Sequence, residues 1–184
     1  VLYQPEIPPN TGNVIRLAAN TGSNLHLVAP LGFDLSDKQL ARAGLDYHDL
    51  AELQIHTDFD AFLTKVAGQR IFAFTGHTEN SFAEVSYLPG AVLLFGPEPT
   101  GLPASVIAHP RVTSALRIPM MPHLRSLNLA NSASIAVYEA WRQNDLAGHS
   151  KNHRKTVTAS KNRFMNWRKP WQQSRRISHG PADS

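Results

Sequence analysis

Three short segments of the sequence contain the residues that could do chemistry. They read PPNTGNVIR at residues 8–16, FGPEPTGLP at 95–103 and IPMMPHLRSLNLAN at 118–131. Each combines Gly or Pro, which fix the shape of a loop, with polar side chains that can bind a ligand. The chain has no Cys, and its nine His form no HExxH pattern, so the sequence predicts no metal site.

The segment 95–103 has the features of a ligand-binding loop. It begins at the end of a short apolar run, and Gly96 and Gly101 would let a ligand approach the backbone. In open α/β sheets, ligands bind at the carboxyl ends of strands, which is where this loop would lie. Taken alone, the segment is also compatible with an ordinary Gly/Pro turn. It lacks the GxGxxG pattern of dinucleotide-binding folds.

The segment 118–131 predicts a fixed loop that leads into a helix. Pro119 and Pro122 stop the loop from pairing as a strand, and Ser126 or Asn128 can cap the helix that follows. Small residues at 130–136 make this helix thin enough for close contact with another segment.

The segment 8–16 leads stiffly into another helix, which Asn10-Thr11 can cap. Arg16 lies about two turns beyond Asn10, so the two side chains cannot face one point without help from the loop.

Apolar periodicity predicts the elements that position these segments. Strands are expected at 1–3, 25–29, 52–56, 70–75, 91–95 and 116–118, and helices at 10–20, 36–43, 58–67, 104–108 and 127–143. The runs at 70–75 and 91–95 are almost continuously apolar, as in parallel strands buried on both faces. The alternation of strands and helices therefore predicts an α/β fold with a mostly parallel sheet and helices on both faces.

The charge of the chain is divided unevenly. Residues 1–144 contain 9 Lys/Arg and 12 Asp/Glu, whereas residues 145–184 contain 9 Lys/Arg and 2 Asp. We therefore predict a domain at 1–144 and a flexible basic tail at 145–184, a pattern that suits a polyanionic ligand. No apolar run is long enough to span a membrane and no signal peptide is visible, so a cytoplasmic location is expected.

Taken in order and at this spacing, the three segments resemble the three motifs of the SPOUT superfamily of RNA methyltransferases. They are most similar to the small branch that methylates the ribose 2′-hydroxyl of the tRNA wobble nucleotide, position 34. The resemblance implies a C-terminal trefoil knot, S-adenosylmethionine as methyl donor, tRNA as substrate, and a homodimer built through the first-motif helix and the last helix. Methylation of another tRNA or rRNA position, and a non-catalytic RNA-binding module on the same fold, stay open.

The resemblance also implies roles for individual residues. Arg16 is the leading catalytic candidate, placed over the target ribose. The other catalytic candidates are Asn10, Ser126 and Asn128. The implied cofactor contacts are Phe74, Thr75, Gly96, Glu98, Gly101, Ile118, Met120, Ser126 and Leu127. The adenine is expected among Leu94, Ile118 and Met120. Family members have Thr-Arg where this chain has Pro99-Thr100, so no RNA contact is implied at that loop.

RNA contacts are expected from Arg16, from His123 in the third segment, and from the tail. The tail interleaves basic residues with Phe164, Trp167 and Trp171, a composition that can neutralise phosphates and stack on unpaired bases. The tail residues predicted to bind RNA are Arg154, Lys155, Arg163, Trp167, Arg168 and Lys169. The three aromatic residues also have helical spacing, so a short helix docked on the domain is the competing interpretation.

Overall fold

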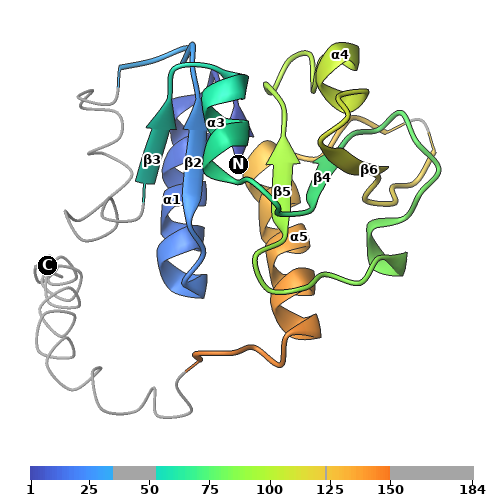
Figure 1. The fold of residues 1–184 in the computed structure, drawn as a ribbon. Helices are drawn as coiled ribbons and strands as arrows, with labels where there is room; N and C mark the ends of the chain where they lie inside the picture. Colours follow the sequence, from blue (N-terminus) through green and yellow to red (C-terminus); the bar gives the residue numbers. More distant parts are fainter. Residues whose placement is uncertain (35–52, 123, 150–184) are drawn as a thin grey trace, which may run out of the picture. The chain divides into compact units, whose positions relative to one another are not determined.

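The computed structural model describes residues 1–34, 53–122 and 124–149 (Figure 1). The strands are β1 (Leu2–Tyr3), β2 (Leu25–Val28), β3 (Leu53–His56), β4 (Ile71–Phe74), β5 (Val92–Phe95) and β6 (Val112–Leu116). The helices are α1 (Pro8–Thr21), α3 (Phe59–Lys65), α4 (Ala104–Ile107) and α5 (Leu129–Gln143), with a 3-10 turn, η1, at Phe82–Glu84. The helix expected at 36–43 lies outside the described residues.

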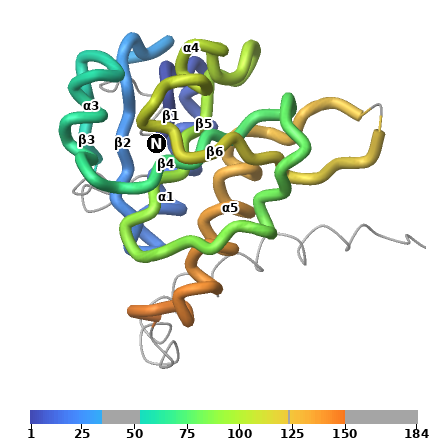
Figure 2. Tube along the Cα trace, turned by 45° about the vertical axis from the view of Figure 1, so that its right-hand side comes forward, coloured from blue at the N-terminus to red at the C-terminus, as the bar shows by residue number. Residues whose placement is uncertain are grey.

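The six strands form one sheet in the order β3-β2-β1-β5-β4-β6, and neighbouring strands pair in parallel. Helices α1 and α5 cover one face, and α3 and α4 cover the other, as Figures 1 and 2 show. The predicted parallel α/β sheet with helices on both faces is confirmed. The predicted knot stays a prediction.

Each face of the sheet has its own buried apolar cluster because side chains alternate along each strand. In β4, Phe72 and Phe74 pack with α1 and α5, whereas Ile71 and Ala73 pack with α3 and α4. Strand β2 is buried along its whole length although it contains a polar residue. His26 is only 9% exposed and packs against Phe62 of α3, because β2 is covered on both faces.

Two of the predicted boundaries are wrong. Helix α1 begins at Pro8 rather than being capped by Asn10-Thr11, since Pro fits the first helical positions, where no backbone N–H is required. Strand β6 lies at Val112–Leu116, earlier than the 116–118 predicted, because Arg117 already pairs with the segment around Ser81. The cap expected for the last helix is confirmed for Asn128, whose side chain accepts hydrogen bonds from the amides of Ala130 and Asn131.

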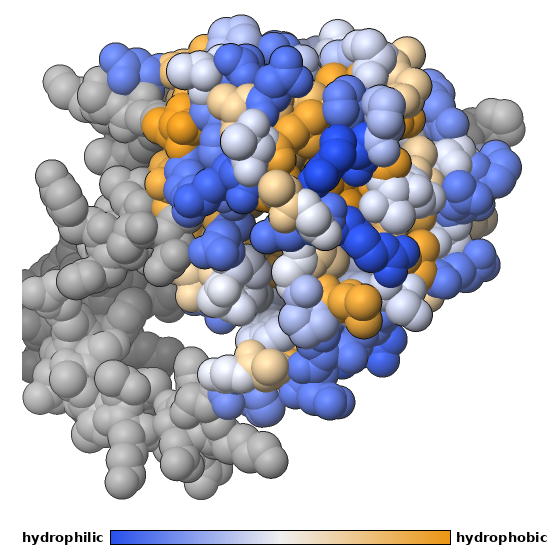
Figure 3. Space-filling view, in the orientation of Figure 1, coloured by the Kyte–Doolittle hydropathy of each residue, from blue (hydrophilic) through white to orange (hydrophobic). Residues whose placement is uncertain are grey.

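The chain divides into units after Gly148, a few residues beyond the predicted boundary. The division follows the end of α5, where Trp141 Nε1 donates to the carbonyl of Ala147. On the face of α3 and α4, apolar residues are interspersed with polar ones rather than joined in one patch (Figure 3). Among the described residues, no helix is both long and apolar enough to cross a membrane.

Candidate active site

The three predicted motifs meet at one edge of the sheet. Strands β4, β5 and β6 end at Phe74, Phe95 and Leu116, and all point the same way. Strand β1 lies beside β5, so the chain between β1 and α1 also leaves from this edge. The loops that follow β1, β5 and β6 are therefore neighbours, although they are far apart in the sequence. The backbone amide of Thr75, just after β4, donates to the carbonyl of Leu116 at 2.9 Å.

The Glu98 carboxylate fastens the second motif to the first. It accepts hydrogen bonds from the backbone amides of Glu6 (2.9 Å) and Ile7 (3.3 Å) and from Asn10 Nδ2 (3.0 Å). These amides lie at the start of α1, where the helix dipole favours a negative charge. The first turn of α1 contains no acidic residue of its own, so Glu98 supplies the charge from another loop.

A second link joins the first motif to the third. Asn128 Nδ2 donates to Asn10 Oδ1 at 2.8 Å, while Asn128 Oδ1 accepts from the first amides of α5. Asn10 is 6% exposed. Its side chain bonds to Glu98 on one side and to Asn128 on the other, and so bridges them. We call Glu98, Asn10 and Asn128 the three-loop network. It positions the N-termini of both α1 and α5 at the same edge of the sheet.

The loop of the second motif is held in a tight turn. The amide of Gly101 donates to the carbonyl of Pro97 at 2.9 Å, and Gly101 has a φ of 70°, a value that favours glycine. A Cβ on Gly96 would overlap the backbone of Gly101 and Leu102. Gly96 was predicted to let a ligand approach, but in the structure its missing Cβ lets the loop close on itself. A Cβ on Gly101 would meet no atom within 4 Å, so the tip of the loop stays open.

The remaining predicted cofactor residues differ in their exposure. Phe74 is 8% exposed and stacks on Phe95, so only its backbone can reach a ligand. Met120 and Leu127 are apolar yet 40% and 38% exposed, and Ile118 lies half-buried at the edge of the core. Exposed apolar side chains beside open backbone groups fit a ligand with an apolar ring and polar edges.

The structure does not support Leu94 as a wall for the adenine. Leu94 is fully buried in the cluster beneath α3 and α4, because β5 turns this side chain away from Ile118. Of the catalytic candidates, Asn10 and Asn128 are brought together, and Ser126 is exposed two residues before Asn128. Arg16 lies on the exposed side of α1 while Asn10 is buried, as their helical separation predicts. His123 and the tail residues lie outside the described residues.

Comparisons with known proteins match this arrangement. The sequence profile of the SpoU rRNA Methylase family matches residues 1–138, which include all three motifs. The chain belongs to this family.

Relatives of this SpoU family member include proteins with named activities. A tRNA (cytidine(34)-2′-O)-methyltransferase of Methylovorus glucosotrophus is 55% identical over 148 residues, covering 80% of this chain and 96% of the relative. A solved structure described for 2-OH methylation of C/U34 on tRNA is 51% identical, with a TM-score of 0.73, and the match covers 78% of this chain and 93% of that one. An AdoMet-bound rRNA methyltransferase from Sinorhizobium meliloti is 26% identical, with a TM-score of 0.67, covering 77% of this chain and 54% of that one.

The SpoU domain also has a cavity that opens away from the motif loops, although Val14 and Phe95 of the first two segments help to line it. A cavity of about 440 Å³ opens at the opposite edge of the sheet, at the start of β2 and β5, lined by residues such as Leu25, Leu88 and Trp141. Within the described parts of the chain, no three His, Asp or Glu side chains cluster as metal ligands would. The motifs, each considered by itself, did not predict that the backbone amides of Glu6 and Ile7 donate hydrogen bonds to Glu98. Only the adjacency of β1 and β5 brings these groups together.

Proposed function

We propose that this protein methylates the ribose 2′-hydroxyl of a tRNA nucleotide, the wobble nucleotide at position 34, with S-adenosylmethionine as methyl donor. The observation that carries the proposal is the three-loop network, which joins all three motifs of the SpoU family at the ligand-binding edge of the sheet. The names of the relatives at more than 50% identity support tRNA and position 34. A cytoplasmic location goes with that substrate.

The donor would be held by the loops at the carboxyl edge. S-adenosylmethionine, when bound, supplies an electrophilic methyl group. In this proposal the loop after Phe74, at Thr75, and the loop around Gly101 hold its polar parts, and Ile118, Met120 and Leu127 offer apolar contacts to its adenine. Gly96 and Glu98 serve the same site indirectly, since their contacts fix the shape of the loop.

The polar residues of the site have separate roles in this proposal. The amides of Asn10 and Asn128 are engaged with each other, so they position the loops rather than transfer protons. Arg16 has a positively charged guanidinium, and it acts by stabilising negative charge on the ribose oxygen or by holding the adjacent phosphate. Ser126 is exposed at the same loop and can bind the substrate. The proton of the 2′-hydroxyl leaves to water or to a phosphate oxygen.

A homodimer belongs to this proposal. Ile135 and Tyr138 lie on the outer side of α5 and are 38% and 49% exposed, although both have large apolar side chains. Helix α5 packs along α1, so a partner subunit docking there would reach the helix that presents Arg16. In the dimer, the helix that presents Arg16 would thus lie beside the partner subunit, and the two chains together would complete the site.

The experiment that tests the function is methyl transfer from labelled S-adenosylmethionine to tRNA transcripts that differ in anticodon. We expect label at the 2′-oxygen of nucleotide 34, located by nuclease digestion and mass spectrometry. Label at another tRNA position, or label only when rRNA is supplied instead of tRNA, would identify a different substrate for the same methyl-transfer reaction. Binding of tRNA without cofactor binding would identify the non-catalytic module instead.

Arg16→Ala tests the catalytic role. We expect the rate at saturating substrates to fall by about 100-fold or more, because one preorganised charge on the reacting oxygen is lost. The dissociation constant of S-adenosylmethionine, measured by calorimetry, should stay within about twofold. Asn20→Ala is the control, since Asn20 is exposed near the end of the same helix. Weakened cofactor binding with an unchanged maximal rate would contradict the role of Arg16.

A further inference from the structure

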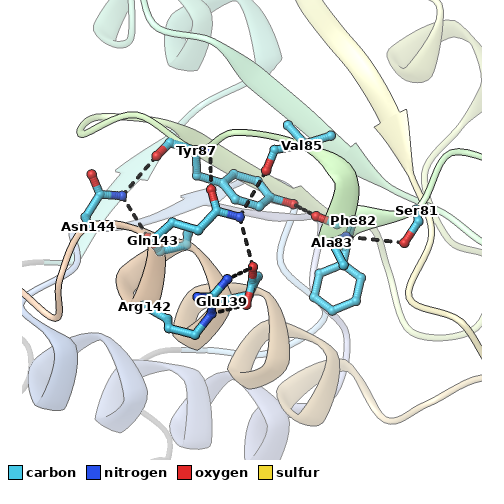
Figure 4. Close-up of polar contacts among 10 residues, drawn as sticks. Ser81, Phe82, Ala83, Val85, Tyr87, Glu139, Arg142, Gln143 and Asn144 are labelled. Atoms are coloured by element: carbon cyan, nitrogen blue, oxygen red, sulfur yellow. Dashed lines mark hydrogen bonds and ion pairs between the residues drawn. The ribbon is translucent and has the colours of Figure 1, made fainter.

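The last turn of α5 is hydrogen-bonded to a segment between β4 and β5 that lies outside all three motifs. Gln143 pairs with its backbone at two points: its Oε1 accepts from the amide of Tyr87 at 2.9 Å, and its Nε2 donates to the carbonyl of Val85 at 3.0 Å (Figure 4). Asn144 Nδ2 adds a bond to the carbonyl of Tyr87 at 3.0 Å. We call residues 80–87 the strap.

The orientation of the Gln143 amide is fixed from within α5. Glu139 Oε1 accepts from Gln143 Nε2 at 2.9 Å, and both carboxylate oxygens accept from Arg142 (Figure 4). These bonds lower the pKa of Glu139 to about 2, so the carboxylate stays charged. Because the carboxylate attracts the NH₂ group of Gln143, the amide oxygen is left to face the amide of Tyr87.

The other end of the strap is anchored to Arg117, the residue directly before the third motif. The amide of Arg117 donates to the carbonyl of Asn80 at 2.8 Å, and the amide of Phe82 donates to the carbonyl of Arg117 at 3.0 Å. Within the strap, the Tyr87 hydroxyl donates to the carbonyl of Phe82 at 2.8 Å. Burial, with a smaller effect of Glu139, raises the pKa of Tyr87 to about 12, which keeps this donor protonated.

The strap therefore connects two predicted cofactor loops to the far end of α5. It follows Thr75 by a few residues and pairs with Arg117, the residue directly before Ile118. Its backbone is thus hydrogen-bonded at one end to Gln143 and Asn144, and at the other end to Arg117. The same helix begins in the three-loop network, so α5 acts on the site from both of its ends.

We propose that Gln143 is a positioning residue for the cofactor loops, acting through the strap on Thr75 and Ile118. This inference rests on the proposed function and adds a residue outside all three motifs. Gln143 contacts neither reacting group in this arrangement. It contributes by holding the loops in the shape that binds S-adenosylmethionine.

Calorimetric titration of the full chain with S-adenosylmethionine, followed by transfer kinetics, tests the proposal. Gln143→Met keeps the side-chain volume and removes both backbone bonds. We expect its dissociation constant to rise about tenfold, with the rate at saturating cofactor within about threefold of the wild type. Gln69→Met is the matched control, because it makes the same substitution at an exposed glutamine outside the strap and the three motifs. Its dissociation constant should not change.

Asn144→Ala provides a second test should Gln143→Met fail to fold, with a smaller rise in the dissociation constant expected. A lowered melting temperature with unchanged cofactor affinity would overturn the proposal, since that result describes a merely structural bond. An equal loss of affinity in Gln69→Met would also overturn it. The wild-type titration distinguishes failure of the proposed cofactor from failure of the proposed role of Gln143. If the wild type does not bind S-adenosylmethionine, the cofactor assignment itself is refuted. If the wild type and Gln143→Met bind it equally well, only the role of Gln143 is refuted.

Discussion

At the scale of single residues, the Glu98 carboxylate joins the first two motifs through three hydrogen bonds. One carboxylate accepts from two backbone amides and one side-chain amide, all at the start of α1. Bonds to a charged acceptor are stronger than neutral ones, and the helix dipole adds to them. Glu98 therefore holds the first two motifs in register.

Glu98→Gln should separate this role from general destabilisation. The new NH₂ group would face N–H donors, so we expect the free energy of unfolding to fall by about 2 kcal/mol and methyl transfer to fall at least about tenfold. Denaturant titration and the transfer assay measure the two effects. Glu79→Gln is the control. The Glu79 side chain is 90% exposed and forms an ion pair with Arg117 at 3.4 Å, and exposed ion pairs of this kind contribute little to stability. Equal effects of both variants would contradict this account.

The sequence allowed Asn10, Glu98 and Asn128 to be selected as site residues, but not as partners of one another. Each was assigned to the site through the family resemblance of its own motif, and the Gly, Pro and capping patterns of a motif act only within a few residues. Their hydrogen bonds span 88 and 118 residues of sequence and depend on which strands lie side by side. Local patterns carry no information on that adjacency. The bond from Gln143 to the strap was missed for the same reason.

At the scale of elements, the edge of the sheet at β2 and β3 contains a buried histidine pair. His26 Nδ1 and His56 Nε2 lie 2.9 Å apart, and the Phe62 ring packs against both in a T-shaped arrangement. Burial, followed by nearby positive charge, lowers the pKa of His26 to about 4, and burial also lowers the pKa of His56. A second proton would put two charges in this contact.

We therefore expect stability to depend on pH between about 6.5 and 4. In this window the unfolded chain binds more protons than the folded one, so stability is fully present above pH 6.5 and is lost as pH falls. The loss from pH 7 to pH 5 should be about 2 kcal/mol in denaturant titrations and should shrink in His26→Gln. His77→Gln, at an exposed position, should keep the wild-type dependence. A flat wild-type profile would refute the explanation.

Element types were predicted better than element ends. The buried strands β4 and β5 were predictable because their apolar runs are short and uninterrupted. Strand β6 was displaced in the prediction because Val112–Leu116 includes Thr113 and Ser114, whereas the apolar Leu116 and Ile118 were more conspicuous. The start of α1 was displaced because Pro8 and Pro9 read as a loop, although Pro also fits the first helical turn.

At the scale of the whole molecule, charge is separated along the chain. The predicted domain at 1–144 has more acidic than basic residues, and residues 145–184 have nine basic and two acidic ones. The match to the Methylovorus relative covers 96% of that protein but 80% of this chain. We propose that the basic tail is an additional tRNA-binding arm that increases affinity without forming the site.

Removal of residues 149–184 tests the arm. The cut should follow Gly148 rather than Gln143, because Asn144 and Ala147 bond to the strap and to α5. We expect weaker tRNA binding and a shallower dependence of affinity on salt, since each lost phosphate contact reduces the logarithmic slope by about 0.7–0.9. The melting temperature should stay close to that of the full chain. Unchanged tRNA affinity with a large loss of stability would favour the docked helix.

The strand order has a consequence for the order in which this protein can be assembled. The first of the six strands, β1, lies in the middle of the sheet, between β2 and β5. A ribosome delivers β2 soon after β1 but delivers β5 only at residues 92–95, and α5, which covers α1, later still. During synthesis β1 is therefore paired on one side only, and pairings between distant segments also form slowly. An unpaired strand edge attracts other chains, so the nascent protein is most open to misassembly before its second motif emerges.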